Sequence, residues 1–66
     1  MEFFDMQCFV NVVDAQSFSK AANAMFISQP ALSKRILNLE KELGIRLLAR
    51  NKHLIALTPA GKIFYF

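Results

Sequence analysis

The sequence predicts a mostly α-helical fold, in which three packed helices are followed by a two-stranded β wing and the start of a fourth helix. Three observations favour this fold. Apolar residues recur at helical spacing, serine and threonine residues that can cap helices stand before three segments, and two short apolar runs flank a basic stretch. With 66 residues, the chain has room for one small domain.

The first helix is expected from about Phe3 to Ala15, where apolar residues recur every three or four positions. They occupy two opposite sides, with Met6, Phe9, Val10 and Val13 on one and Phe4, Cys8 and Val12 on the other. A helix that is apolar on two sides is covered twice. We therefore expect this helix to be the central packing element, with Cys8 as a small core residue.

A second, short helix is expected through about Phe26, and Ser17 or Ser19 can cap its start. Ile27 is expected to make the turn that follows. The third helix covers about residues 29–43, with Ser28 as N-cap, Pro30 in the first turn and Gly44 as the stop. Its inward stripe is Leu32, Ile36, Leu39 and Leu43, and its outer face is Pro30, Ser33, Lys34, Asn38 and Lys41, with Leu37 as the one apolar residue.

Two apolar runs, 47–49 and 54–57, flank the stretch Arg-Asn-Lys-His at 50–53 and predict a hairpin with a basic tip. Thr58 followed by Pro59 is a typical helix start, and this last helix continues to Phe66. Its final four residues are apolar with no cap behind them. We therefore expect the chain to be part of a longer protein.

The net charge of +3 conceals an asymmetry along the chain. Residues 1–18 hold three acids and no base, whereas residues 19–66 hold all eight bases and two acids, a net charge of +6. A polyanion is the partner that such a segment favours. The other interpretation is an ordinary solvated basic surface.

Several functional classes are excluded by what the chain lacks. One cysteine and one histidine, Cys8 and His53, form neither an internal disulfide nor a structural zinc site, so we expect no metal and no cofactor. The five carboxylates are expected on helical surfaces without a paired histidine or second acid, which argues against an enzyme. Neither a signal peptide nor a membrane-spanning run is found, so a soluble, cytoplasmic protein is expected.

The basic outer face of the third helix has the size and chemistry that a DNA major groove, about 12 Å wide, accepts. Helix and hairpin together make a winged helix-turn-helix. The candidate DNA-binding residues are Ser28, Gln29, Pro30, Ser33 and Lys34 on the helix, and Arg50, Lys52 and His53 on the wing. Gln29 can pair with adenine N6 and N7. The alternative is a winged-helix module for protein or RNA contact, which Leu37 on the outer face favours.

Four fragments of the sequence form a distinctive set: Ser-Phe-Ser-Lys-Ala-Ala at 17–22, Ile-Ser-Gln-Pro-Ala-Leu-Ser at 27–33, Leu-Leu-Ala-Arg at 47–50 and Leu-Thr-Pro-Ala-Gly at 57–61. With these fragments the chain resembles the N-terminal domain of LysR-type transcriptional regulators. The resemblance implies sequence-specific binding to double-stranded DNA by residues 1–58, with the helix at about 29–43 in the major groove and the wing, 50–54, at the backbone or minor groove. At His53 the family usually has arginine, so a neutral imidazole is expected to be a weaker minor-groove anchor, with Lys52 as its substitute.

The resemblance further implies that residues 59–66 begin a linker helix that pairs two subunits on an inverted-repeat operator. A small-molecule effector would bind a C-terminal domain outside this sequence. Seven of the eight aromatic residues lie in the first 18 residues or the last three. We therefore expect a homodimer interface on the first and last helices, with Phe4, Phe64 and Tyr65 as candidate residues.

Overall fold

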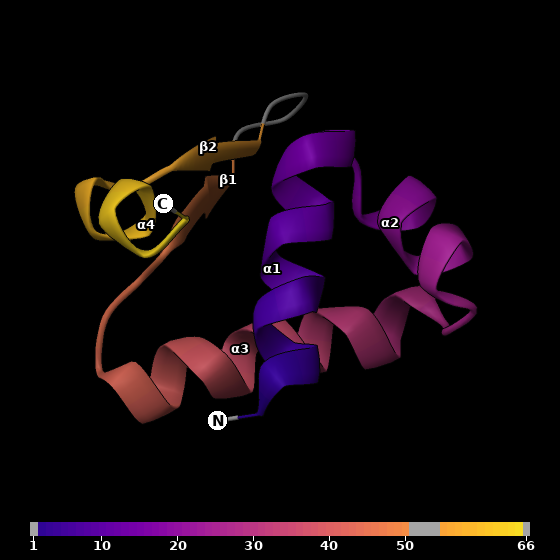
Figure 1. Cartoon of the computed structure of the whole chain (residues 1–66), viewed down its shortest axis with the longest axis horizontal. Coiled ribbons are helices and arrows are strands. Elements are labelled where there is room, and N and C mark those ends of the chain that lie inside the picture. Colours follow the sequence, from indigo (N-terminus) through magenta and orange to yellow (C-terminus); the bar gives the residue numbers. More distant parts are fainter. Residues whose placement is uncertain (1, 51–54, 66) are drawn as a thin grey trace.

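The computed structural model describes residues 2–50 and 55–65, with Arg50 described by its backbone alone. The chain runs through α1 (Phe3–Ala15), α2 (Phe18–Met25), α3 (Gln29–Leu43), β1 (Leu48–Arg50), β2 (Ile55–Leu57) and α4 (Pro59–Tyr65) (Figure 1). The predicted fold class is confirmed: three helices are followed by a two-stranded antiparallel wing and a fourth helix. The wing tip, with Lys52 and His53, lies outside the described residues.

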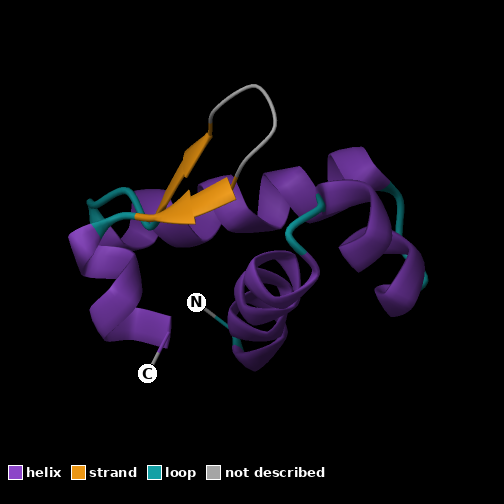
Figure 2. Ribbon diagram, turned by 90° about the horizontal axis from the view of Figure 1, so that it is seen from above, coloured by secondary structure: helices purple, strands orange, loops and turns teal. Residues whose placement is uncertain are grey.

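The central position predicted for α1 is confirmed. It crosses α3 and lies between α2 on one side and the hairpin with α4 on the other (Figure 1). Viewed from above, α1 is seen nearly end-on, with α4 on one side of it and α2 on the other (Figure 2). The buried core is drawn from α1, α2, α3 and the start of the wing: Cys8, Phe9, Val12, Phe18, Ala21, Ala22, Leu32, Ile36, Leu39, Leu47 and Leu48.

The helix starts follow from local hydrogen bonds that the sequence encodes. Ser17, not Ser19, caps α2, since its hydroxyl accepts the Lys20 N–H at 3.0 Å. The Ser28 hydroxyl accepts the Ala31 N–H at 3.2 Å at the start of α3. At the start of α4 the Thr58 hydroxyl accepts the Gly61 N–H at 3.0 Å. Each bond satisfies a backbone donor that has no partner within its helix.

The turn between α2 and α3 differs from the expectation. Phe26, not Ile27, takes the left-handed conformation that ends α2, with φ +60°. The β-branched Ile27 is poorly suited to that conformation, and it packs against the core instead. A bulky aromatic residue therefore occupies the strained position and is 94% exposed.

The wing is a short antiparallel pair in which Leu48 faces Leu57 and Arg50 faces Ile55. Its first strand begins at Leu48 rather than Leu47. Just before it, the Leu47 carbonyl accepts the Thr58 N–H at 3.0 Å and the Leu47 N–H donates to Glu40. No helix within the described ranges is long and apolar enough to cross a membrane.

Candidate nucleic-acid interface

The first turn of α3 stands at the surface and carries most of the predicted helix contacts. Ser28, Gln29, Pro30 and Lys34 are exposed, and Ser33 is half-buried. The Ser28 hydroxyl oxygen accepts the capping hydrogen bond, so its own proton stays available to donate. The N-terminal end of a helix also carries the positive end of its dipole, which favours an anion.

The outer face continues along α3 with exposed Leu37, Asn38 and Lys41. Lys34 and Lys41 make no ion pair with any residue that the structure describes. Two shallow grooves of about 660 and 250 Å³ hollow the surface beside Leu37, which lines both. The face therefore offers free cations, one amide and one apolar side chain to a partner.

The two arginines nearest this face are held by acids of the same chain. Arg35 Nη1 lies 3.0 Å from Asp5 Oδ1 and 3.8 Å from Glu2, and its guanidinium stacks over Phe4 at 4.8 Å. This contact joins α3 to the start of α1. The Arg35 hydrogen bond lowers the pKa of Asp5 below its ordinary value despite the opposing effect of burial.

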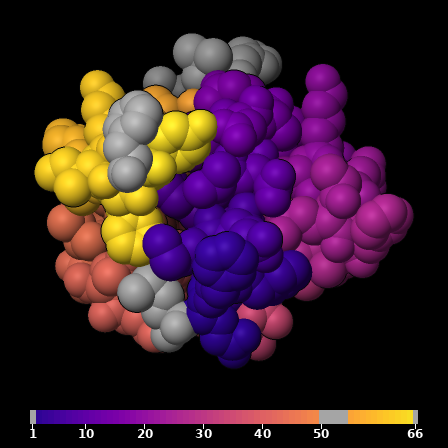
Figure 3. All heavy atoms as spheres, viewed as in Figure 1, coloured from indigo at the N-terminus to yellow at the C-terminus, as the bar shows by residue number. Residues whose placement is uncertain are grey.

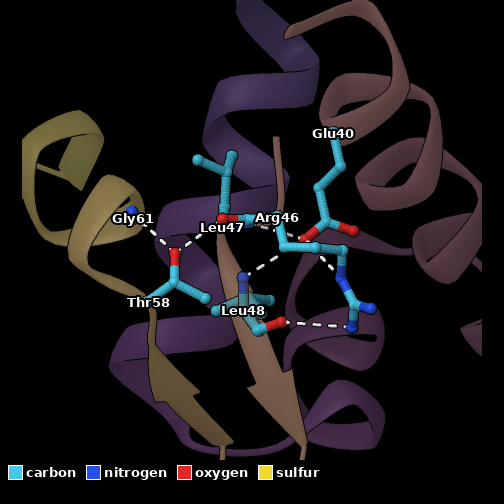
Figure 4. A network of polar contacts seen from close by, with 6 residues as sticks. All are labelled: Glu40, Arg46, Leu47, Leu48, Thr58 and Gly61. Atoms are coloured by element: carbon cyan, nitrogen blue, oxygen red, sulfur yellow. Dashed lines mark hydrogen bonds and ion pairs between the residues drawn. The ribbon is translucent and has the colours of Figure 1, made fainter. Parts of the chain in front are cut away.

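A second contact set joins α3 to the wing and to α4 (Figure 4). One oxygen of the buried Glu40 carboxylate, Oε2, accepts the N–H of Leu47 at 2.8 Å and the N–H of Leu48 at 3.2 Å. The same oxygen lies 3.6 Å from Arg46 Nε. Thr58 then donates its hydroxyl to the Arg46 carbonyl at 2.6 Å while capping α4. Glu40 thereby holds the base of the wing in place beside α3.

The expectation that all five carboxylates lie on helical surfaces is wrong for Asp5 and Glu40, which are 6% and 7% exposed. Asp5 is paired with Arg35 and accepts the N–H of Glu2, just before its own helix. Glu40 lies beside Arg46 and accepts the N–H groups of Leu47 and Leu48. These partners allow the two carboxylates to be buried. The sequence contains a weak signal for this role, since Glu40 sits between the inward residues Leu39 and Leu43 on the flank of the apolar stripe. Cys8 is buried in the core as expected, and burial raises the pKa of its thiol.

The short α4 is docked on α1 (Figure 3). Phe64 and Tyr65 pack edge-on against Phe9, with ring centroids 6.1 and 6.4 Å apart. The Tyr65 hydroxyl also donates to Asp14 near the end of α1, which raises the pKa of Tyr65. The predicted dimer residues Phe4, Phe64 and Tyr65 are thus half-buried within their own chain.

The predicted wing contacts are described only in part. Arg50 ends β1, opposite Ile55, and its side chain is outside the description. Lys52 and His53 lie in the segment 51–54, also outside it. Among the described side chains, no group of three or more His, Cys, Asp or Glu could hold a metal ion.

The fold is a winged helix-turn-helix domain. In it, α2, α3 and α4 pack around α1, α3 is exposed after a tight turn, and the antiparallel hairpin lies beside α3. The chain belongs to the LysR family: the sequence model described as "Bacterial regulatory helix-turn-helix protein, lysR family" matches residues 3–62. Curated relatives include the HTH-type transcriptional regulator BenM of Acinetobacter baylyi, 51% identical over 65 residues. The nitrogen assimilation regulatory protein nac of Escherichia coli is 45% identical over 65 residues.

The match covers 98% of this chain but 21% of BenM and 21% of nac, so the chain spans about one fifth of their length. Solved structures with the same fold include the DNA-binding domain of BenM in complex with its benA site 1 DNA. That structure is 51% identical with a TM-score of 0.94, over 98% of this chain and 73% of the other. The DNA complex of the CbnR DNA-binding domain is 37% identical with a TM-score of 0.92, over 98% and 75%.

Proposed function

We propose that this chain binds double-stranded DNA sequence-specifically, with α3 in the major groove and the wing, residues 50–54, at the backbone or minor groove. The observation that carries the proposal is the first turn and outer face of α3, where Gln29, Pro30 and Lys34 are exposed; of the two acids on its flanks, Glu40 is buried and Glu42 is exposed. The likeness to BenM and CbnR domains solved with DNA supports it. Gln29 and Ser33 would contact bases, and Ser28 and Lys34 bases or phosphates.

The base-reading role is tested with Gln29→Ala on a duplex selected from a random pool. Removing a good bidentate contact costs about 1–3 kcal/mol on the cognate site and relaxes one base position. Gln7→Ala, an exposed glutamine on α1, is the matched control and should bind as the parent does. Base preferences that are identical for Gln29→Ala and the parent would exclude this role.

The wing contacts are tested with Lys52→Ala against Lys62→Ala on α4. Removing a phosphate contact at Lys52 should weaken binding to all duplexes alike and reduce the salt dependence of log Kd by about 0.9 per contact. Lys62→Ala should leave that slope unchanged. An unchanged slope for Lys52→Ala would remove the wing lysine from the interface.

For the whole protein we propose a bacterial transcriptional regulator in the cytoplasm with no catalytic activity. Residues 1–58 would be its DNA-binding domain and residues 59–66 the start of a linker helix. Two copies would pair through α1 and α4, using Phe4, Phe64 and Tyr65, on an inverted-repeat operator. A small-molecule effector would act through a further domain. Sedimentation of a longer chain, with and without operator DNA, tests the pairing.

A further inference from the structure

Leu37 is the large apolar side chain that α3 leaves outside the core. It is 62% exposed, whereas the inward residues Leu32, Ile36 and Leu39 are 0–3% exposed. Folding therefore does not use most of this side chain. Its place is the feature to explain, because it lies on the same outer face of α3 as Ser33 and Lys34, one turn beyond them.

The helical spacing puts Leu37 in register with the proposed base readers. It follows Ser33 by four residues and Lys34 by three, so all three share one face. At about 1.5 Å per residue, Leu37 is about 6 Å along the axis from Ser33, close to two base-pair steps of about 3.4 Å. A helix that brings Ser33 to the base edges thus carries Leu37 into the same groove.

The charges around Leu37 restrict what can cover it. Lys34 and Lys41, one turn to either side, are exposed cations without an ion pair among the described residues. The acid one turn away, Glu40, is buried with its carboxylate bound to the Leu47 and Leu48 N–H groups. The partner that these charges favour at Leu37 is therefore a polyanion that presents an apolar group between its charges.

Within a major groove, the apolar group of that kind is the 5-methyl of thymine. We propose that Leu37 is a specificity-determining residue that packs against a thymine methyl, an assignment that rests on the proposed DNA binding. Lys34 and Lys41 hold phosphates on either side while Leu37 contacts the methyl. An acidic protein segment would suit the same cations, but Leu37 is continuous with the base-reading residues, and this favours DNA.

The test replaces single thymines by deoxyuridine, which removes the methyl and leaves base pairing intact. On the duplex selected by the parent protein, one replacement should weaken binding about fourfold, the value for about 0.8 kcal/mol per buried methyl. The same replacement should leave the Kd of Leu37→Ala unchanged. Gln7→Ala, at an exposed residue of α1, is the control and should keep the fourfold loss.

Because Leu37 is exposed, Leu37→Ala should stay folded, which far-UV circular dichroism checks. A second variant, Leu37→Gln, carries the donor and acceptor that pair with adenine and should shift the preferred base at that position. An equal loss of affinity on deoxyuridine in the parent and in Leu37→Ala would overturn the assignment of Leu37 and leave the proposed DNA binding intact. The same conclusion would follow if Leu37→Ala bound the duplex as tightly as the parent does but lost contact with a protein partner. A pool that enriches no sequence would overturn the proposed function as well.

Discussion

Replacing Glu40 by alanine removes the acceptor that joins α3 to the wing. The carboxylate accepts the N–H groups of Leu47 and Leu48, residues that are 1% and 3% exposed. Without it, both donors are buried unpaired at about 1–3 kcal/mol each. We expect a loss of about 2–6 kcal/mol in the free energy of unfolding. A core of this size supplies about 3–5 kcal/mol in all, so Glu40→Ala should be largely unfolded.

Glu40→Gln separates the hydrogen bonds from the charge. Its amide oxygen can still accept both N–H groups, and the ion pair with Arg46, which is 73% exposed, contributes at most about 1 kcal/mol. We expect a loss of about 1 kcal/mol, with the fold and duplex binding retained. Lys41→Ala, an exposed neighbour, should stay within about 0.5 kcal/mol of the parent.

Urea unfolding followed by far-UV circular dichroism measures the three variants against the parent protein. The expected order of destabilisation is Glu40→Ala, then Glu40→Gln, then Lys41→Ala. If Glu40→Ala unfolded within about 0.5 kcal/mol of the parent, water or a shifted backbone would be satisfying the two donors. Glu40 would then not be the anchor of the wing.

Three further perturbations test other contacts. Gly61→Ala places a Cβ 2.1 Å from the Leu47 carbonyl oxygen and should lower the free energy of unfolding in urea by well over about 1 kcal/mol. At Gly44 a Cβ would have no atom within 4 Å, so Gly44→Ala should lower it by about 1 kcal/mol, the cost of its φ of +69°. Arg35 lowers the pKa of Asp5, so the stabilisation that this carboxylate gives the folded protein is complete above the unfolded-state pKa of about 3.9. It is lost as the pH falls through the pKa of Asp5 in the folded protein. Asp5→Asn should remove this loss from melting curves between pH 2 and 6. Phe26→Asn suits the left-handed turn and should raise the urea midpoint by the equivalent of about 1 kcal/mol, and a lower midpoint would contradict the strain.

The helices were predictable because their ends are set by neighbours in sequence. Ser28 and Thr58 accept N–H groups three residues ahead, and Gly44 takes the left-handed stop, so each signal is complete within one turn. The inward stripe of α3 is equally local, because a fixed helical period decides which residues share a face. These features depend on no contact between distant parts of the chain.

The two buried acids were not predictable on the same grounds. Asp5 meets Arg35 across 30 residues, and Glu40 meets the backbone of residues 47 and 48 across a turn. A carboxylate on a helix flank has the same sequence pattern whether water or a distant donor satisfies it. Only the packing of α3 against α1 and the wing distinguishes the two cases.

The aromatic residues do not divide simply between core and interface. Phe9 and Phe18 lie in the core, and the rings of Phe64 and Tyr65 pack on Phe9. The apolar side chains of α1 and α4 with most surface left are Phe3 at 76% and Ile63 at 82%. The proposed pairing of two copies therefore has more area to gain from these two residues than from the half-buried rings.

The structure also changes what the basic charge can do. The net charge of residues 19–66, +6, sets the long-range attraction to a polyanion whether or not individual groups are paired. Close contact depends on unpaired cations, and Arg35 and Arg46 are held by Asp5 and Glu40. The association rate should therefore depend on the whole basic segment. The salt slope of the affinity should depend only on the few cationic side chains that contact phosphates.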